Sequence, residues 1–127
     1  GFTPGVTTCY DLRFPELYRR LTKEGAQIVF LPAAFTLHTG KDHWESLIRA
    51  RAIENQLFFI ASGQIGYHPP ERECYGNSMI VDPWGTVLAR AANRPGVTFA
   101  EVDISYQDKI RKELPCLDHI REDVFKT

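Results

Sequence analysis

The feature that most constrains the fold is a continuous apolar run, Ile28-Val29-Phe30-Leu31, which lies between Gly25 and Pro32. Successive side chains of a strand point to opposite faces, so a strand without polar positions is covered on both sides. A second apolar run of strand length, residues 57 to 62, follows after a helix-length segment. Buried strands that alternate with helices are typical of layered α/β proteins. The two runs therefore predict an α/β fold with a sheet inside it.

The first half of the chain predicts strands and helices in alternation. Residues 6 to 9 are β-branched or apolar and predict a first strand, followed by a tight turn. Pro15 falls in the first turn of a predicted helix that ends at Gly25. A loop is expected over residues 33 to 41, and a second helix from residue 42 to about residue 56, where an acidic capping pattern precedes an apolar face.

The second half predicts shorter elements. The polar stretch with two prolines, residues 67 to 74, is typical of a surface loop. Strands are expected over 78–81 and 86–89, because the Asp-Pro-Trp-Gly segment between them suits a type I turn. A further strand is predicted over 97–102, and a short last helix over 105–114. Together these elements favour mixed strand directions in a single domain without internal repeats.

Composition narrows the class of ligand. The net charge of -1 over 127 residues provides no basic surface for nucleic acid. No apolar run approaches the roughly 20 residues that a membrane-spanning helix needs. The three cysteines are too few and too widely spaced for a disulfide framework, which favours a reducing compartment. We therefore expect a cytoplasmic protein with a small-molecule ligand.

Cys9 is the residue that position alone singles out for chemistry. It follows a predicted strand and precedes a turn and a helix, an arrangement that can expose a thiolate near helix amide groups. The alternative is an inert buried thiol, since free cysteine is among the most buried residue types. The cysteine and histidine spacings match no zinc motif, and the chain has no glycine-rich nucleotide-binding motif. Neither a zinc site nor a nucleotide-binding site is therefore expected.

A cysteine and histidine pair is the alternative catalytic arrangement that the residues allow. His38 and His43 follow the buried strand over residues 28–31 and could reach the same edge of the sheet as Cys9. Such an enzyme would use one of them as the base for Cys9. Both histidines are equally compatible with solvated positions in a loop or a first helical turn.

Four segments resemble the nitrilase superfamily, the carbon-nitrogen hydrolases, and they occur in the same order as in that family. The run from Thr8 to Leu17 is similar to the segment that carries the nucleophile. The other three are Pro32–Phe35 with Thr39-Gly40 and His43-Trp44-Glu45, then Arg49–Asn55, then Tyr75–Ser78 with Asp82–Gly85. Within the superfamily the chain looks most like the branch that contains omega-amidase and deaminated-glutathione amidase.

The resemblance implies a fold and a chemistry. The fold would be part of a four-layer α-β-β-α sandwich with mixed sheets, and the complete protein would form homodimers through helices. The chemistry would be hydrolysis of a small amide through a thioester on Cys9, with the backbone N–H of Tyr10 binding the oxyanion and without a metal or organic cofactor. Arg13, Phe35 and Thr39 match positions that line the family's substrate pocket, and arginine suits a substrate carboxylate such as that of a 2-oxo acid monoamide. A salt bridge from Arg13 to Glu16 is the structural alternative.

The resemblance also implies what the chain lacks. In the family, a catalytic Glu, a Lys and a second Glu precede the cysteine, and only eight residues precede Cys9 here. Residues 1–127 are therefore expected to be the carboxy-terminal part of a single domain, inactive on their own and prone to associate. Arg51 and Glu54 are expected to form a structural ion pair instead of filling these catalytic roles. A non-catalytic binding module that keeps the fold remains the alternative from another class of function.

Overall fold

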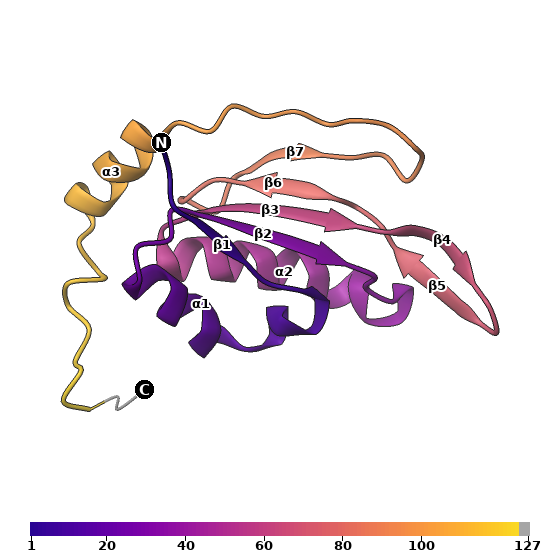
Figure 1. The fold of residues 1–127 in the computed structure, drawn as a ribbon, viewed down its shortest axis with the longest axis horizontal. Helices are drawn as coiled ribbons and strands as arrows, with labels where there is room; N and C mark the ends of the chain where they lie inside the picture. Colours follow the sequence, from indigo (N-terminus) through magenta and orange to yellow (C-terminus); the bar gives the residue numbers. More distant parts are fainter. Residues whose placement is uncertain (125–127) are drawn as a thin grey trace.

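A five-stranded mixed sheet organises the computed structural model, which describes residues 1–124 (Figure 1). Neighbouring strands follow the order β1-β2-β3-β6-β7, and β4 and β5 form a separate hairpin. The apolar runs at residues 28–31 and 57–62 lie in β2 and β3. The strands are β1 (Pro4–Val6), β2 (Ile28–Ala33), β3 (Phe58–Gly63), β4 (Ile65–His68), β5 (Arg72–Tyr75), β6 (Met79–Val81) and β7 (Val87–Arg90).

The strand directions explain where the helices lie. β1, β2 and β3 are parallel, and the connections between them are made by helices α1 (Pro15–Lys23) and α2 (Leu37–Asn55). Both helices cover the same face of the sheet in Figure 1, as right-handed crossovers in one direction require. β6 and β7 complete the sheet as an antiparallel hairpin around the predicted turn at residues 82–85. The predicted α/β class and mixed sheet are confirmed.

The core lies between the sheet and the two helices. Alternate strand residues point toward the helices, and α1 and α2 contribute large side chains that are fully buried. Helix α1 ends at Lys23, and Gly25 follows with a φ of 96°, which is the left-handed conformation expected of a glycine after a helix. The core residues include Tyr18, Val29, Leu31, Trp44, Ile48, Ala52, Phe59, Ala61, Met79 and Val81.

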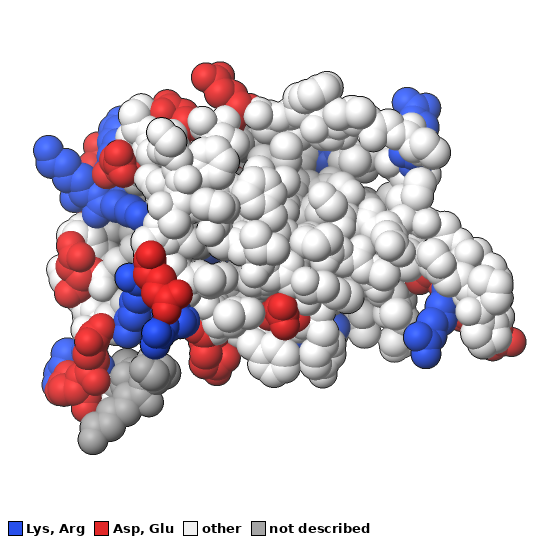
Figure 2. All heavy atoms as spheres, in the orientation of Figure 1, with Lys and Arg blue, Asp and Glu red and all other residues white. Residues whose placement is uncertain are grey.

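The opposite face of the sheet carries a row of apolar side chains. Val6 pairs with Phe30, Phe30 with Ile60, and Ile60 with Ile80, so these four residues form one row across four strands. Val6 is 70% exposed, and the other three are half-buried. Figure 2 shows a broad area without charged side chains over the middle of the molecule, where Figure 1 draws the strands. None of α1, α2 or α3 (Ile104–Glu113) covers this area.

Helix α2 begins earlier than the sequence predicts. The expected loop over residues 33–41 is wrong from Leu37 onward, because Thr36 already acts as the N-cap residue with extended backbone angles. The first helical hydrogen bond joins Gly40 N to Thr36 O at 2.8 Å. Glycine lowers helix propensity, but Gly40 lies where the helix meets Tyr75, so a tertiary contact compensates for it. The extra turn places Thr39 on a helix.

Three further predictions of secondary structure are wrong, the first being the strand over residues 6 to 9, because the strand there is β1 at Pro4–Val6 and Cys9 already begins a 3₁₀ helix. Residues 67–74 do not form a loop, since β4 and β5 pair in an antiparallel hairpin from Ile65 with Tyr75 to His68 with Arg72. Residues 97–102 do not form a strand, although they are extended beside β7 in Figure 1. Val97 and Phe99 in that segment are 79% and 83% exposed, so their β propensity is not supported by packing.

Candidate active site

The candidate site residues gather at one edge of the sheet. Cys9 follows β1, Phe35 and Thr39 follow β2, and Gln64 follows β3. Because these three strands are parallel, their carboxyl ends lie at the same edge, which is where open α/β sheets bind ligands. The topology therefore places Cys9 and Thr39, which are 30 positions apart in the sequence, at the same edge of the sheet.

Cys9 has an unusual backbone conformation. Its φ is 44°, in the left-handed region that residues other than glycine rarely adopt. It is the first residue of the 3₁₀ helix η1 (Cys9–Arg13) and is half-buried against the core. Strained residues of this kind cost about 1–3 kcal/mol and are found preferentially at functional sites. The turn presents the Cys9 side chain at the strand edge instead of within the core.

Hydrogen bonds on both sides hold this turn in place. Thr8 N donates to Asp11 Oδ2 at 2.8 Å, which closes the turn around Cys9. Thr7 N donates to Phe30 O at 3.0 Å, and this bond attaches the chain just before the turn to β2. The hydroxyls of Thr7 and Tyr18 lie 3.1 Å apart in the interior. Burial raises the pKa of Tyr18 to about 12, so this phenol stays protonated and can serve as a donor.

Arg51 supports the same turn from helix α2. Its Nε donates to Leu12 O at 3.1 Å, and its Nη1 lies 3.1 Å from Glu54 Oε1. The Arg51 side chain is 7% exposed and that of Glu54 is 37% exposed. The expected ion pair is therefore confirmed, with the arginine as its buried member. Its bond to Leu12 gives the pair a structural role in holding η1 against α2.

Tyr10 lies directly after Cys9 in η1. The first backbone N–H groups of a helix have no acceptor within the helix, so the N–H of Tyr10 is a candidate donor to a ligand beside Cys9. Its ring is 65% exposed and contacts the ring of Phe14 edge-on at 5.5 Å between centroids. The oxyanion role of the Tyr10 N–H remains a prediction.

Arg13 is held between aromatic rings. Its guanidinium carbon lies 5.1 Å from the ring centroid of Phe35 and 5.9 Å from that of Tyr10. Its Nη1 lies 3.3 Å from Nδ1 of His43. Within residues 1–124 it forms no salt bridge with Glu16, which was the structural alternative for this residue. The predicted substrate residues Arg13 and Phe35 are thus in direct contact.

Phe35 and Thr39 are fixed by their neighbours. Phe35 is 4% exposed and packs on Trp44, with ring centroids 5.1 Å apart. Trp44 is anchored in turn, since its Nε1 donates to Asn77 O at 2.8 Å. The Thr39 hydroxyl lies 3.0 Å from the hydroxyl of Thr36. Both predicted substrate residues therefore lie on a rigid support.

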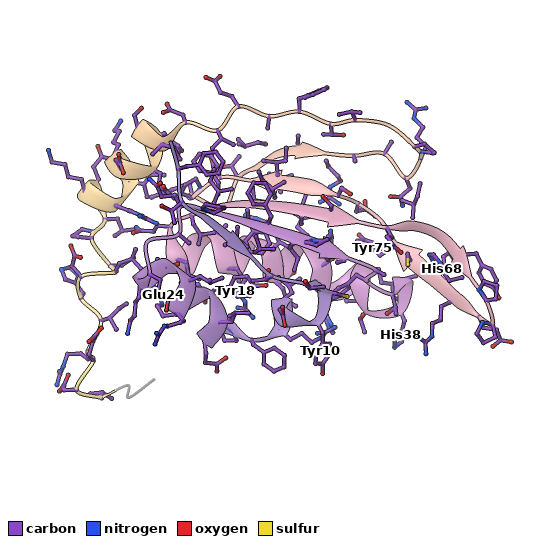
Figure 3. All side chains as sticks on the ribbon, viewed as in Figure 1. Tyr10, Tyr18, Glu24, His38, His68 and Tyr75 are labelled. Carbon is purple, nitrogen blue, oxygen red and sulfur yellow. The ribbon has the colours of Figure 1, made fainter. Side chains whose placement is uncertain are left out.

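Tyr75 closes this region from the hairpin side. Its backbone N donates to Phe35 O at 2.8 Å, and its side chain packs directly against Gly40 of α2. The structure places Tyr75 at the end of β5 beside the candidate site, and Gly76 follows it with a φ of 67°. Figure 3 shows Tyr75 and His68 on the hairpin that projects from the sheet.

Neither histidine bonds to the nucleophile candidate. Among the described residues, no hydrogen bond joins the Cys9 sulfur to His38 or His43. His43 instead contacts Arg13, and His38 lines a different groove with Lys41 and Tyr67, in the region that Figure 3 labels. The contact expected of a cysteine and histidine enzyme is therefore not found. The sequence does not predict the contact of His43 with Arg13, because the two residues lie 30 positions apart and no local pattern links them.

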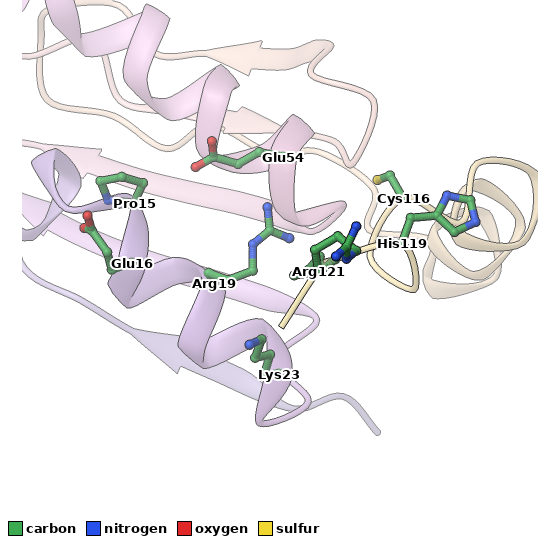
Figure 4. Close-up of a pocket in the computed structure, with 9 residues that line it drawn as sticks. Pro15, Glu16, Arg19, Lys23, Glu54, Cys116, His119 and Arg121 are labelled. Atoms are coloured by element: carbon green, nitrogen blue, oxygen red, sulfur yellow. The ribbon is translucent and has the colours of Figure 1, made fainter. Parts of the chain in front are cut away.

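A separate cavity of about 420 Å³ lies away from Cys9 (Figure 4). It is formed by helix α1, Glu54 near the end of α2 and the stretch that follows α3, and none of the predicted site residues lines it. Two of its cations are engaged, since Lys23 pairs with Glu122 and Arg121 with Asp123, whereas Arg19 Nη1 is buried without a hydrogen-bond partner among residues 1–124. The chemistry of the predicted site therefore does not extend into this cavity.

Residues 1–124 contain neither a metal-binding cluster nor a helix that could span a membrane. No group of three or more His, Cys, Asp or Glu residues in that part of the chain is arranged to hold a metal ion. No helix within the described range has the length and apolar character needed to cross a bilayer. The expectation that the chemistry needs no cofactor stays a prediction.

Comparisons with known proteins agree on one family. A family model described as carbon-nitrogen hydrolase matches residues 3–112. The nitrilase and fragile histidine triad fusion protein NitFhit of Caenorhabditis elegans is 51% identical over 95% of this chain and 28% of its own length. Deaminated glutathione amidase of Synechocystis is 50% identical over 91% of this chain and 42% of its own length. The human protein of that name is 48% identical over 95% of this chain and 37% of its own length.

Solved structures give the same result. The crystal structure of C. elegans NitFhit matches with a TM-score of 0.93 and 51% identity, over 96% of this chain and 30% of that one. Saccharomyces cerevisiae Nit3, described as a member of branch 10 of the nitrilase superfamily, matches with a TM-score of 0.83 and 35% identity, over 88% of this chain and 41% of that one. The 127 residues thus span less than half the length of the relatives they match.

Proposed function

Because this chain belongs to the carbon-nitrogen hydrolase family, we propose that a protein carrying it hydrolyses a small carboxylate-bearing amide to an acid and ammonia. Cys9 is the nucleophile in this proposal. The observation that carries it is the strained turn at Cys9, at the edge where Arg13, Phe35 and Thr39 also gather. Relatives named deaminated glutathione amidase support amide hydrolysis as the reaction class.

The reaction has two halves. The Cys9 thiolate attacks the amide carbonyl carbon, the Tyr10 N–H stabilises the oxyanion that forms, and the carbon-nitrogen bond breaks as ammonia leaves with a proton from a general acid. Water then attacks the thioester carbon, the carbon-sulfur bond breaks, and the acid is released. By the family resemblance, the general acid and base is a Glu that precedes the cysteine. None of residues 1–8 is a Glu or a Lys.

The proposed substrate carries a carboxylate near its amide. Arg13 supports this choice, since a guanidinium can bind a carboxylate with two parallel hydrogen bonds and its plane is already oriented by Phe35. Thr39 offers a hydroxyl on the adjoining helical turn. A 2-oxo acid monoamide carries both a carboxylate for Arg13 and an amide for Cys9.

Replacement of the nucleophile tests the proposal. In the complete protein, Cys9→Ser and Cys9→Ala should abolish ammonia release from a panel of 2-oxo monoamides without changing the melting temperature. Cys74→Ser is a matched control, because Cys74 is another half-buried free thiol, located on β5. Ammonia release that survives both Cys9 substitutions would rule out this nucleophile.

A second experiment addresses the missing catalytic groups. We expect the 127 residues alone to release no ammonia, because the Glu and Lys that the family places before the cysteine are not among them. Activity of the isolated chain would contradict this part of the proposal. If the complete protein also lacks both residues ahead of Cys9 and stays inactive, the non-catalytic binding module becomes the better explanation.

The resemblance also supports an assembly and a location. We propose that the complete protein is a homodimer that pairs through helices, and that it works in the cytoplasm. Three free cysteines, Cys9, Cys74 and Cys116, fit a reducing compartment. Sedimentation of the complete protein tests the first point, since a monomer at micromolar concentration would contradict it. Cell fractionation tests the second.

A further inference from the structure

The contact between Arg13 and His43 defines the orientation of a guanidinium that would otherwise be mobile. Arg13 is only half-buried, and an arginine side chain has many rotamers. The rings of Tyr10 and Phe35 restrict its plane, but stacking leaves rotation within that plane free. The 3.3 Å contact between Nη1 and His43 Nδ1 removes this freedom. His43 therefore determines which edge of the guanidinium faces outward.

The chemistry of this bond fixes the state of the histidine. Arginine is always a donor, so Nδ1 of His43 must be the acceptor and must carry no proton. The tautomer that accepts at Nδ1 carries its proton on Nε2. One guanidinium N–H is used in this bond, which leaves four of the five that arginine carries. Two parallel donors remain available for the bidentate binding of a carboxylate.

The backbone of His43 lies on a rigid part of helix α2. The next residue, Trp44, is fully buried and hydrogen-bonded to Asn77 O. One turn earlier, Gly40 packs against Tyr75. A side chain that orients another one is effective only if its own backbone is fixed, and these contacts on either side of His43 meet that condition.

We propose that His43 is a positioning residue that aligns Arg13 for the substrate carboxylate and so sets the preference for acidic amides. The inference rests on the proposed function, because it concerns how that site selects its substrate. His43 acts through Arg13 and does not bond to Cys9, so its effect falls on binding of the carboxylate and not on attack at the carbonyl.

The test compares an acidic amide with a neutral one in the complete protein. The two substrates are a 2-oxo dicarboxylic acid monoamide and its methyl ester. His43→Ala should raise KM for the acid by roughly tenfold, the effect of one lost hydrogen bond to a charged group, and leave kcat nearly unchanged. The kinetic constants for the ester should stay within about twofold.

Two variants sharpen the test. His43→Asn should restore most of the lost affinity, because the asparagine Oδ1 can accept from Arg13 at nearly the position of Nδ1. His38→Ala removes an exposed histidine from the first turns of the same helix and should leave both substrates unaffected. Equal losses for acid and ester in His43→Ala, or no rescue by Asn, would overturn the inference.

A binding measurement separates this inference from the proposed function. Calorimetry with a 2-oxo dicarboxylate, which contains no amide and needs no turnover, should give a roughly tenfold weaker Kd for His43→Ala than for the unaltered protein. If the unaltered protein hydrolyses neither amide, the proposed function fails. The comparison of Kd values still tests whether His43 positions Arg13. Equal Kd values, or no binding to the unaltered protein, would overturn the positioning role.

Discussion

Arg51 of helix α2 donates a hydrogen bond from Nε to the backbone oxygen of Leu12, and this bond joins the helix to the turn that begins at Cys9. Arg51→Met should keep the packing of the side-chain stem but lose this bond and the ion pair with Glu54. We expect a loss of about 2–3 kcal/mol in the free energy of unfolding, because a buried carbonyl and a carboxylate lose a charged partner. Urea unfolding of the complete protein measures this loss of stability. The kcat of the variant should also fall, because the turn that carries Cys9 loses its support.

The control for this prediction is the same substitution at an exposed position. Arg20 bonds to Glu24 in an exposed pair on α1, where its side chain is 70% exposed. Arg20→Met should cost less than about 1 kcal/mol, because exposed ion pairs contribute little. Equal losses for the two variants would mean that the contact with Leu12 has no special structural role.

Gly40→Ala should destabilise the protein, although alanine is normally the better helix residue. A Cβ at position 40 would lie 2.6 Å from Cγ of Tyr75, which is closer than two carbon atoms can approach. Relief requires α2 and β5 to separate, at a cost of about 1–3 kcal/mol for overpacking. Thermal unfolding is the measurement. Ser46→Ala, at an exposed position of the same helix, is the control and should change stability by less than about 0.5 kcal/mol.

The sequence is informative about the sheet and the nucleophile turn because local patterns determine both. The apolar runs in β2 and β3 leave no polar face, and the Asp-Pro-Trp-Gly segment specifies the β6–β7 turn almost alone. The position of Cys9 before the helix that starts at Pro15 also follows from local signals. These elements lie where the sequence predicts them, except that the first strand, predicted over residues 6 to 9, is β1 at Pro4–Val6.

What local patterns miss depends on contacts between distant residues. The early start of α2 depends on Gly40 packing against Tyr75, which lies 35 positions away. The β4–β5 hairpin contains two prolines at its turn and is exposed throughout β4, so its composition resembles that of a loop. The contact of Arg13 with His43 likewise joins η1 to α2. No short window along the chain contains both Gly40 and Tyr75, or both Arg13 and His43, whereas the hairpin is a local element that is missed because of its polar composition.

Tyr18 predicts a loss of stability at alkaline pH. Its folded-state pKa is raised by burial to about 12, from an ordinary value of 10.0. Between these pH values the unfolded chain releases the phenolic proton and the folded chain keeps it. The contribution of Tyr18 to the free energy of unfolding is therefore complete below pH 10 and is lost as the pH rises toward 12. The loss should reach roughly 2–3 kcal/mol, given 1.36 kcal/mol for each pKa unit.

The comparison with Tyr18→Phe isolates this effect. Near neutral pH the variant should be less stable by about 1 kcal/mol, because Thr7 loses its buried hydrogen-bond partner. Above pH 10 that difference should shrink and then reverse, since the variant has no phenol to ionise in the unfolded chain. Urea unfolding at several pH values between 8 and 12 is the measurement, with Tyr106→Phe on α3 as the control. A constant difference across this range would contradict the assignment.

The row of Val6, Phe30, Ile60 and Ile80 predicts how the isolated chain behaves. In a four-layer sandwich this face would pack against a second sheet, and the 127 residues alone leave it open to solvent. Exposed apolar faces of this extent promote association, so the isolated chain should form oligomers at micromolar concentration.

Charge at the edge of that row should reduce the association. Val6 is 70% exposed on β1, so Val6→Lys adds a charge to the open face without disturbing the core. Sedimentation of the isolated chain should then shift toward the monomer. Leu114→Lys, at a 49% exposed position after α3, is the matched control and should leave the oligomers unchanged. A monodisperse monomer that unfolds cooperatively before any substitution would mean that the open face is compatible with an independent fold.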